Sequence, residues 1–414
     1  MRKVFKFGGA SIKDAVSIIN VGNILLDSKE ENLLIVFSAI GKVTNMFEDV
    51  VKNYFHGERM CFSQLEEIKL LHENIAVDLF KNKLILKELD DIFLEIRNLL
   101  GENVLLEFSY YYDQIVSFGE ILSSFIMSKY LESIGFSHCL IDAKNIIHTD
   151  RQHRNAKINW DLTIDAINKE IPDKNIITQG FIASSKGVTT TLGREGSDFT
   201  AAILGHVLDA LEVVIWKDVP GMMNADPEYF PNATVFSELS FDEAIELAFY
   251  GAKIIHPKTI QPLKDKHIPL KIRSFINKNL SGTIIKEGGS VNRIPSYIIK
   301  HNQILLSISD ASLSFIVEDH ISRIFYLLSQ YSIRVNMIQN SAVSFSICID
   351  NDQYKVPDLI SALQKDFRVY YNKDLSLLTV RNYTEEIIKE LIVNKSVFLE
   401  QKSRNTVQLV INSE

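Results

Sequence analysis

The order of elements at the start of the chain places the strongest limit on its fold. An aromatic and β-branched run, Val4 to Phe7, ends in Gly8 and Gly9. A helical pattern follows over 12–26, and Leu33 to Phe37 forms a second apolar run. Because a strand, a helix and a second strand in this order are typical of a crossover between parallel strands, the start of the chain predicts an α/β fold.

The middle of the first 290 residues departs from this alternation. From about residue 46 to 135 apolar residues recur every three or four positions, which predicts a helical insert. Helical patterns return at 200–208 and 241–248, among strand patterns at 138–141, 176–183, 188–192, 213–216 and 268–272. We therefore expect one α/β domain over 1–290, which ends in the Gly/Ser/Pro-containing stretch 286–295.

Two weakly similar units, 296–371 and 372–414, follow this domain. Their strand and helix patterns lie at 304–308, 320–330, 334–338 and 343–349, and at 377–381, 384–392, 397–401 and 407–411. A repeated small α+β unit is typical of ligand-binding modules, although plain structural or dimerisation domains would give the same pattern. The second unit is short, so we expect it to borrow elements from the first unit or from a partner chain.

Composition excludes several classes of protein. The 44 Lys and Arg residues against 52 Asp and Glu give a net charge of −8, and no basic stripe is visible, so the sequence predicts neither nucleic-acid nor membrane binding. Cys61, Cys139 and Cys348 are far apart and lack metal-binding spacing, which indicates buried thiols of a reduced cytoplasm. No apolar run approaches the ~20 residues of a membrane span, and no signal-peptide pattern opens the chain.

Four loops each bring a cation to the expected carboxyl edge of the sheet. They are KFGGAS with Lys6, LGREGSD with Arg194, WKDVPGMMNADP with Lys217 and GAKIIHP with Lys253. Open α/β sheets bind ligands at this edge. In a chain of net negative charge, the clustering predicts a polyanionic small molecule such as a nucleotide.

The glycine turn of KFGGAS would let backbone N–H groups approach a phosphate, and a helix start after it favours negative charge. Ser11 and Asp14 have the spacing of a capping box at that helix start. A Gly-Gly turn alone is more often only a tight turn, and the sequence contains no Walker-type GxxxxGK[ST] string.

Carboxylates and an arginine mark three further loops. Arg194 can hold a carboxylate through a bidentate pair, and Asp198 can orient nearby lysine ammonium groups. Asp218 and Asp226 flank a Pro-Gly turn in a loop whose polar density a simple β-turn does not explain. Glu120 of SFGE, by contrast, would by itself indicate only a solvated helix residue.

Six motifs resemble the aspartate kinase family in their order and separation: KFGGAS, SAIGKVTN, SFGE, LGREGSD, WKDVPGMMNADP and FYGAKIIHP. The two C-terminal units resemble the ACT regulatory domains of that family. The resemblance implies a three-layer α/β/α sandwich of the amino-acid-kinase type with a mainly parallel sheet, followed by tandem α+β ACT-like units. It also implies transfer of the ATP γ-phosphoryl group to the β-carboxylate of L-aspartate, the first step of lysine, threonine and methionine synthesis.

The resemblance also implies roles for individual residues. Lys6 and Lys253 would contact phosphate oxygens, and Asp198 would hold their ammonium groups in place. Aspartate would be bound by four residues: Arg194 at its α-carboxylate, Glu120 at its α-ammonium, and Thr44 and Ser197. The implied nucleotide-binding residues are Lys6, Gly8, Gly9, Ser11, Trp216, Lys217, Asp218, Met223, Asp226 and Lys253. Mg²⁺ would be held mainly by ATP phosphates, with no protein metal ligand.

Five positions depart from the commoner family pattern: Ala10, Glu195, Lys217, Met223 and Glu228. All six loops are nonetheless kept. We therefore interpret the chain as a divergent member of the family.

Feedback control is where the departure is largest. In lysine-inhibited members, acidic side chains of the segment that matches 333–344 help hold the effector. Here Asn336 replaces an Asp, Ala342 stands where a Glu is found, and Arg334 adds a positive charge. We therefore expect weak or absent inhibition by lysine, with the units serving as a homodimer or homotetramer interface or for another effector such as threonine. An Asn336 that hydrogen-bonds lysine nearly as well as Asp would keep the site working. The candidate regulatory residues are Ile333, Val335, Asn336, Asn340 and Ser341.

Two alternatives change the function. Another acyl-phosphate-forming or related kinase, with acylglutamate, glutamate or uridylate as acceptor, would keep the fold, but such kinases lack the SFGE helix and the tandem units. An inactive amino-acid-binding regulatory protein would have lost Lys6, Arg194, Asp198 or Lys253, and all four are present.

Overall fold

A computed structural model describes residues 2–28, 32–81, 84–101, 107–252, 254–289, 294–310 and 315–412. The chain divides into two compact units. The first comprises Met1–Met222, Val235–Ile245 and Ile254–Val291, and the second comprises Met223–Thr234, Glu246–Lys253 and Asn292–Glu414. Within the described ranges, no helix is long and apolar enough to cross a membrane.

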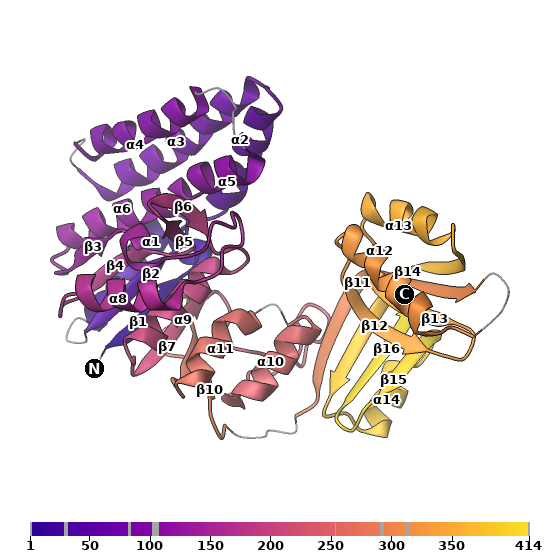
Figure 1. Cartoon of the computed structure of the whole chain (residues 1–414). Helices are drawn as coiled ribbons and strands as arrows, with labels where there is room; N and C mark the ends of the chain where they lie inside the picture. The colour runs from indigo at the N-terminus through magenta and orange to yellow at the C-terminus, as the bar shows by residue number, and fades with distance from the viewer. Residues whose placement is uncertain are drawn as a thin grey trace. The chain divides into compact units, whose positions relative to one another are not determined.

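The first unit is built on an eight-stranded sheet with the order β3-β4-β2-β1-β7-β9-β10-β8 (Figure 1). Its strands are β1 (Lys3–Phe7), β2 (Leu33–Phe37), β3 (Cys139–Ile141), β4 (Ile176–Gln179), β7 (Glu212–Lys217), β8 (Glu238–Ser240), β9 (Leu270–Ser274) and β10 (Thr283–Lys286). All neighbours pair in parallel except β9 and β10. The expected mainly parallel sheet is therefore confirmed.

Helices cover both faces of this sheet. They are the 3-10 turn η1 (Gly9–Ile12), α1 (Ala15–Asp27), α7 (Ala143–Ile146), α8 (Trp160–Glu170), α9 (Gly196–Val207), α10 (Phe241–Tyr250), which enters the second unit, and α11 (Pro257–Asp265). Because strand residues alternate between faces, Phe5 and Phe7 enter the core that includes α1, while Lys6 faces α9. This alternation is consistent with the three-layer arrangement that the family resemblance implies.

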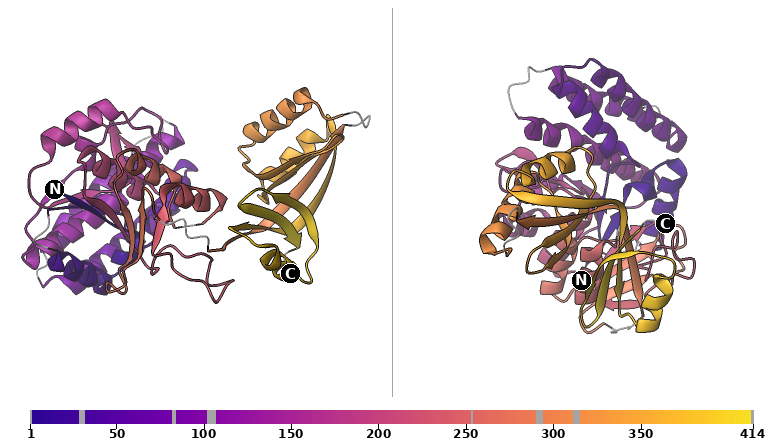
Figure 2. Two further views of the ribbon diagram at one scale, coloured as in Figure 1. Left: turned by 90° about the horizontal axis from the view of Figure 1, so that it is seen from below. Right: turned by 90° about the vertical axis from the view of Figure 1, so that its right-hand side faces the viewer.

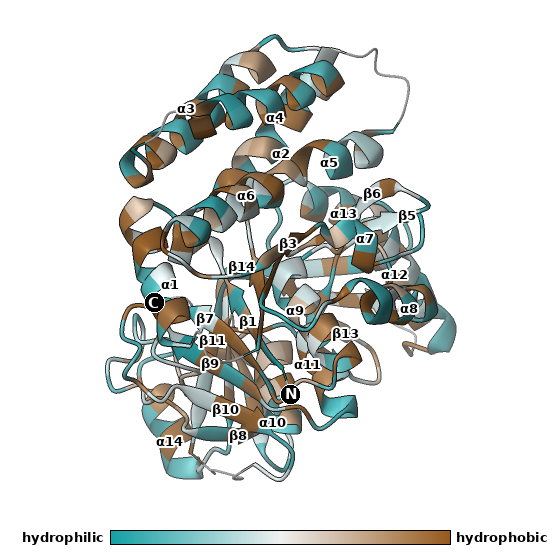
Figure 3. Ribbon diagram, turned by 90° about the vertical axis from the view of Figure 1, so that its left-hand side faces the viewer, coloured by the Kyte–Doolittle hydropathy of each residue, from teal (hydrophilic) through white to brown (hydrophobic). Residues whose placement is uncertain are grey.

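The insert expected between about 46 and 135 is helical throughout its described residues. It contains α2 (Val43–Phe55), α3 (Met60–Leu79), α4 (Leu84–Gly101), α5 (Phe108–Val116) and α6 (Phe118–Ser133). Figure 3 shows apolar and polar faces along α3 and α4. The apolar face of α3 buries Leu65 and Ile68, and that of α4 buries Leu89 and Phe93, in the same core as β1 and β2.

Two local expectations differ from the structure. The strand expected over 176–183 is broken into β4 and β5 (Ile182–Ser185), and β5 pairs with β6 (Val188–Thr191) in a separate hairpin. The break falls at Gly180, where a Cβ would lie 2.4 Å from Ser197, so the backbone must turn past α9. The first helix begins at Ala15 instead of residue 12, and Asp14 caps it by accepting from Ser17 N–H.

The second unit contains a six-stranded antiparallel sheet with the order β12-β13-β11-β14-β16-β15. The strands are β11 (Ser296–Asp310), β12 (Val335–Asn340), β13 (Phe345–Asp350), β14 (Phe367–Arg381), β15 (Val397–Lys402) and β16 (Thr406–Asn412), with helices α12 (Glu318–Gln330), α13 (Lys355–Leu363) and α14 (Glu385–Leu391). Helices α12 and α13 share one apolar core with this sheet, which Figure 2 shows from two further directions.

The strands β11 and β14 run through both halves of this sheet. Residues 305–310 of β11 pair with 367–372, while residues 296–300 pair with 377–381. The C-terminal half, with α14, β15 and β16, is therefore completed by the first five residues of β11. These five residues fall within the range 296–371 that the sequence assigns to the first unit.

Candidate active site

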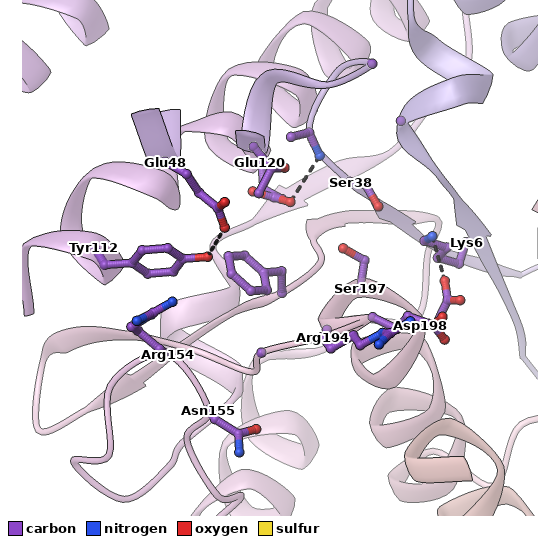
Figure 4. Close-up of a pocket in the computed structure, with 18 of the residues that line it drawn as sticks. Lys6, Ser38, Glu48, Tyr112, Glu120, Arg154, Asn155, Arg194, Ser197 and Asp198 are labelled. Atoms are coloured by element: carbon purple, nitrogen blue, oxygen red, sulfur yellow. Dashed lines mark hydrogen bonds and ion pairs between the residues drawn. The ribbon is translucent and has the colours of Figure 1, made fainter. Parts of the chain in front are cut away.

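A cavity of about 810 Å³ lies where three parallel strands of the first unit end. Lys6 of β1, Ser38 after β2 and Lys217 of β7 all line it, and the first turn of α9 contributes Ser197 and Asp198. Parallel strands bring their carboxyl ends to one edge, which explains why these distant segments meet. Figure 4 shows the side chains of Lys6, Ser38, Ser197 and Asp198 around one space.

Two lysines and one buried carboxylate form an ion cluster on one side of the cavity. Asp198 is 2% exposed, and its Oδ1 lies 2.5 Å from Lys6 Nζ while its Oδ2 lies 3.2 Å from Lys217 Nζ. Burial alone would raise the pKa of Asp198, but the two ammonium groups outweigh burial and hold the pKa below its usual value. One carboxylate therefore fixes two cations at the ends of adjacent strands.

The glycine turn after β1 lies against this cluster. A Cβ on Gly8 would be 3.3 Å from Lys6 Nζ, and a Cβ on Gly9 would be 2.6 Å from the carbonyl oxygen of Gly41. Ser11 Oγ donates to the Gly8 carbonyl at 2.6 Å and so closes the turn, although Ser11 does not cap α1. Only glycine permits this close approach of the two loops.

Glu120 reaches the cavity from the first turn of α6. It is 3% exposed; Oε1 accepts the Ala39 N–H at 3.1 Å, and Oε2 has no hydrogen-bond partner in the described residues. Burial raises the pKa of Glu120 to about 8. Since a buried carboxylate oxygen without a partner is costly, this atom is suited to accept from a ligand.

The LGREGSD loop joins β6 to α9 and supplies Arg194 and Ser197. The loop contains two left-handed residues, Gly193 (φ 73°) and Glu195 (φ 52°), and Gly196 N–H donates to the Gly193 carbonyl at 3.0 Å. Arg194 is exposed at the cavity, and no carboxylate of the described residues lies within ion-pair distance of it. Thr44, in the first turn of α2, also lines the cavity.

Sequence reasoning missed the opposite wall of the cavity. Buried Asp113 accepts from His153 Nδ1 at 2.7 Å, from Thr191 Oγ1 at 2.6 Å and from the Arg154 N–H at 3.0 Å. The Arg154 guanidinium lies 4.6 Å from the ring centre of Tyr112, whose hydroxyl donates to Glu48 in a 2.6 Å hydrogen bond (Figure 4). The only signal in the sequence was a polar run over 150–155, between the strand patterns at 138–141 and 176–183.

Four other nucleotide-binding candidates, Trp216, Asp218, Met223 and Asp226, do not line this cavity. Trp216 is 3% exposed and stacks on Phe7 with ring centres 5.8 Å apart, so its side chain lies in the core. Asp218 follows β7 outside the cavity lining, and Met223 and Asp226 belong to the second unit. Lys253 lies outside the described residues.

The regulatory candidates lie on or near β12 of the second unit. Ile333 and Val335 pack against the core of α12 and α13, whereas Asn336 has polar partners. Lys300 Nζ donates to Asn336 Oδ1 at 3.0 Å, and Asn336 Nδ2 donates to Gln303 at 2.8 Å and to Asp350 at 2.9 Å. Two further candidates, Asn340 and Ser341, are exposed at the end of the strand.

Comparisons with known proteins agree with this geometry. The model of the amino acid kinase family matches residues 1–274. Aspartokinase 1 of Arabidopsis thaliana chloroplasts is 31% identical over 86% of this chain, which spans 65% of that protein's length. Two solved structures of Escherichia coli aspartokinase III, one with lysine and aspartate and one with aspartate and ADP, are 25% identical. They superpose with TM-scores of 0.84 and 0.83, and the matches cover 99% and 100% of this chain and 96% of each structure.

The order of the six loops, the fold and these relatives agree with one another. The resemblance to aspartokinases stated from the sequence is thereby confirmed. The matched family model covers well over half of the chain, including every described residue of the cavity. The chain belongs to the amino acid kinase family.

Proposed function

We propose that the protein is an aspartate kinase, which transfers the γ-phosphoryl group of ATP to the β-carboxylate of L-aspartate to give 4-phospho-L-aspartate. The observation that carries the proposal is a single cavity that joins the Lys6–Asp198–Lys217 cluster to the unpartnered oxygen of Glu120. Likeness to an aspartokinase III structure solved with aspartate and ADP supports it. The cluster suits phosphates, and Glu120 suits an ammonium group.

The reaction makes few chemical demands on the protein. A carboxylate is ionised and nucleophilic at neutral pH, so no general base is needed. The difficulty is to bring two anions together and to stabilise negative charge on the moving phosphoryl group. Lys6, fixed by Asp198, supplies a cation for that charge, and Lys217 supplies a second one.

Aspartate would bind on the other side of the cluster. Its α-ammonium would donate to Glu120 Oε2, and its α-carboxylate would pair with Arg194, which stands at the cavity without a carboxylate partner in the described part of the chain. Thr44 and Ser197 would offer hydroxyl groups to the remaining polar atoms. This arrangement directs the β-carboxylate toward Lys6.

The nucleotide would lie against the glycine turn, with Gly8, Gly9 and Ser11 near its phosphates. Trp216, Lys217, Asp218, Met223, Asp226 and Lys253 remain the other candidates for nucleotide contacts. No group of three His, Cys, Asp or Glu side chains that could hold a metal ion occurs among the described residues. Mg²⁺ would be held through ATP phosphates, where the ion would neutralise phosphate charge.

We infer further that this activity serves lysine, threonine and methionine synthesis in the cytoplasm. Aspartokinase III of Escherichia coli was solved with lysine, and the second unit here would take an amino-acid effector. We also infer that the second unit joins chains into a homodimer or homotetramer. Residues 1–290 would form the catalytic domain, with 296–371 and 372–414 as ACT-like units.

A coupled ADP-release assay with several acceptors tests the function. We expect turnover with L-aspartate, and trapping with hydroxylamine should give aspartyl hydroxamate. N-acetylglutamate, glutamate and uridylate should not support turnover. Turnover with one of these acceptors and none with aspartate would contradict the proposal, and binding of aspartate without turnover would favour an inactive regulatory protein.

A further inference from the structure

We propose that Lys258 is a positioning residue, which holds the substrate-binding loop 193–198 in place by contacting the residues at both ends of that loop. The inference rests on the proposed function, because the loop carries Arg194 and Ser197. Lys258 itself does not line the substrate cavity. It lies in the second position of α11, which packs against α9 (Figure 1).

The two contacts of Lys258 bracket the loop. Its Nζ donates to the carbonyl oxygen of Leu192 at 2.8 Å, directly before Gly193. The same ammonium group lies 4.5 Å from the ring centre of Phe199, directly after Asp198. One side chain thus touches the residue before the loop and the residue after it.

Other contacts hold the two ends of the loop. The Leu192 N–H donates to the Phe181 carbonyl at 2.9 Å, and Thr200 Oγ1 accepts the Phe181 N–H at 3.0 Å. Asp198, at the C-terminal end of the loop, also pairs with Lys6 and Lys217. Only the Lys258 side chain adds a hydrogen bond to the Leu192 carbonyl among the described residues.

The surroundings of Lys258 indicate a role in geometry more than in stability. Among the described residues, no carboxylate lies within ion-pair distance of Lys258 Nζ. The partly buried ammonium group contacts the Leu192 carbonyl oxygen and the face of the Phe199 ring instead. Burial lowers the pKa of Lys258. Burying a cation without an anion opposes folding, and hydrogen bonding to Leu192 offsets only part of that cost.

The position of Lys258 is itself defined by the start of α11. His256 caps the helix by accepting the Lys258 N–H at its Nδ1, 3.2 Å away, and Pro257 occupies the first turn. Lys258 lines a cavity of about 480 Å³ together with Trp160 and Gln261. The side chain can therefore be changed in length or charge without steric conflict in the core.

The first experiment separates the two substrates kinetically. Lys258→Met removes the charge and the donor but keeps an unbranched side chain, so the loop loses its contact at Leu192. We expect the KM for aspartate to rise about tenfold, the KM for ATP to stay within about twofold, and Lys258→Arg to restore the KM for aspartate to within about threefold. Gln261→Met is the matched control and should change neither KM. Gln261 lines the same cavity and, within the described part of the chain, its side chain hydrogen-bonds only to Asp265 of its own helix.

The second experiment needs no turnover. Amide hydrogen exchange of the full-length protein without ligands should be faster over 193–199 in Lys258→Met, with exchange over β1 and β2 unchanged. If the wild-type protein lacked activity with aspartate, the proposed function would fail. The exchange result would still test whether Lys258 holds the loop 193–198. Unchanged exchange over the loop, or equal changes in both KM values, would overturn the role of Lys258. Should Lys258→Met unfold, Lys258→Ala, which also removes the charge and the donor, gives the same test.

Discussion

The two sheets of this chain gather their polar side chains in different places. In the mainly parallel sheet, β1, β2 and β7 end at one edge, and Lys6 and Lys217 line one cavity there. In the antiparallel sheet, strand ends alternate between edges. One group of its polar side chains meets across three adjacent strands, where Asn336 and Gln303 both donate to Asp350.

The difference determines which groups remain available to a ligand. At the edge of the parallel sheet, Glu120 keeps one unpartnered oxygen and Arg194 has no carboxylate partner, within the described residues. On the antiparallel sheet, Lys300, Gln303 and Asp350 satisfy Asn336 from all sides. We infer that strand direction accounts for this difference. The edge of the parallel sheet leaves polar groups available to a ligand, whereas the polar groups of the antiparallel sheet already bind one another.

The largest expected effect comes from breaking the ion cluster of the parallel sheet. Lys6→Ala removes a cation that would stabilise the transition state, so turnover should fall at least about 100-fold, or about 2.7 kcal/mol. The same loss is expected for Lys253→Ala on the family resemblance alone. Steady-state kcat is the measurement, and Lys3→Ala on the same strand, where Lys3 pairs with Glu212, is the control. Near-normal turnover of Lys6→Ala would remove Lys6 from the mechanism.

A second effect concerns Arg194 at the same edge. Arg194→Lys keeps the charge but loses the planar pair of donors, so the KM for aspartate should rise about 10-fold or more while that for ATP changes little. Arg151→Lys, at an exposed site outside the cavity lining, should behave as wild type. Equal effects of Arg194→Lys on both substrates would place Arg194 at the nucleotide instead.

A third effect is the pH dependence of aspartate binding. The pKa of Glu120 is raised to about 8 by burial, so the carboxyl is mostly protonated at neutral pH and must lose its proton to accept an ammonium group. The KM for aspartate should therefore fall up to about tenfold per pH unit as pH rises toward 8, and then level off. Glu120→Gln should bind aspartate more weakly and lose this pH dependence. A flat profile in wild type would exclude Glu120 from ammonium binding.

The smallest effect is expected in the antiparallel sheet. Because Asn336 already accepts from Lys300, a lysine effector would have to displace an ammonium group of the protein itself. We expect lysine to bind with a Kd above about 1 mM, which corresponds to a binding free energy of less than about 4 kcal/mol. Lysine at about 1 mM should therefore reduce the rate less than twofold. Threonine and methionine should be titrated in parallel. Half-maximal inhibition by submillimolar lysine would show that Asn336 remains available to an effector.

Elements with strong local patterns could be predicted from the sequence. The strand β2 was located to the residue, since five apolar residues stand between polar segments. The helix α13 was missed, and so were β8 and β10, which contain three and four residues. Such short strands carry too few side chains to show an alternation, and pairing with neighbours decides their structure.

The site was less predictable than the fold. Glu120 has no local signal and was named only through the family resemblance, because its burial depends on packing of α6 against the loop at Ala39. Asp113, His153 and Thr191 are far apart in sequence and meet only in the folded chain. Trp216 and Lys217 were both assigned to the nucleotide, yet successive strand residues face opposite sides, so Trp216 stacks in the core while Lys217 reaches Asp198.

The shared strands of the second unit have a consequence for the order of synthesis and folding. Ser296 pairs with Arg381 and Lys300 with Leu377, so the first five residues of β11 precede their partners in the chain by 85 to 77 positions. Pairing across such a separation closes a long loop and slows folding. Until β14 emerges, residues 296–300 form an open strand edge that invites aggregation. A chain that ended at residue 371 would lack the partner strand of residues 296–300 and leave this edge exposed. Folding of the two halves of the sheet is therefore expected to be coupled.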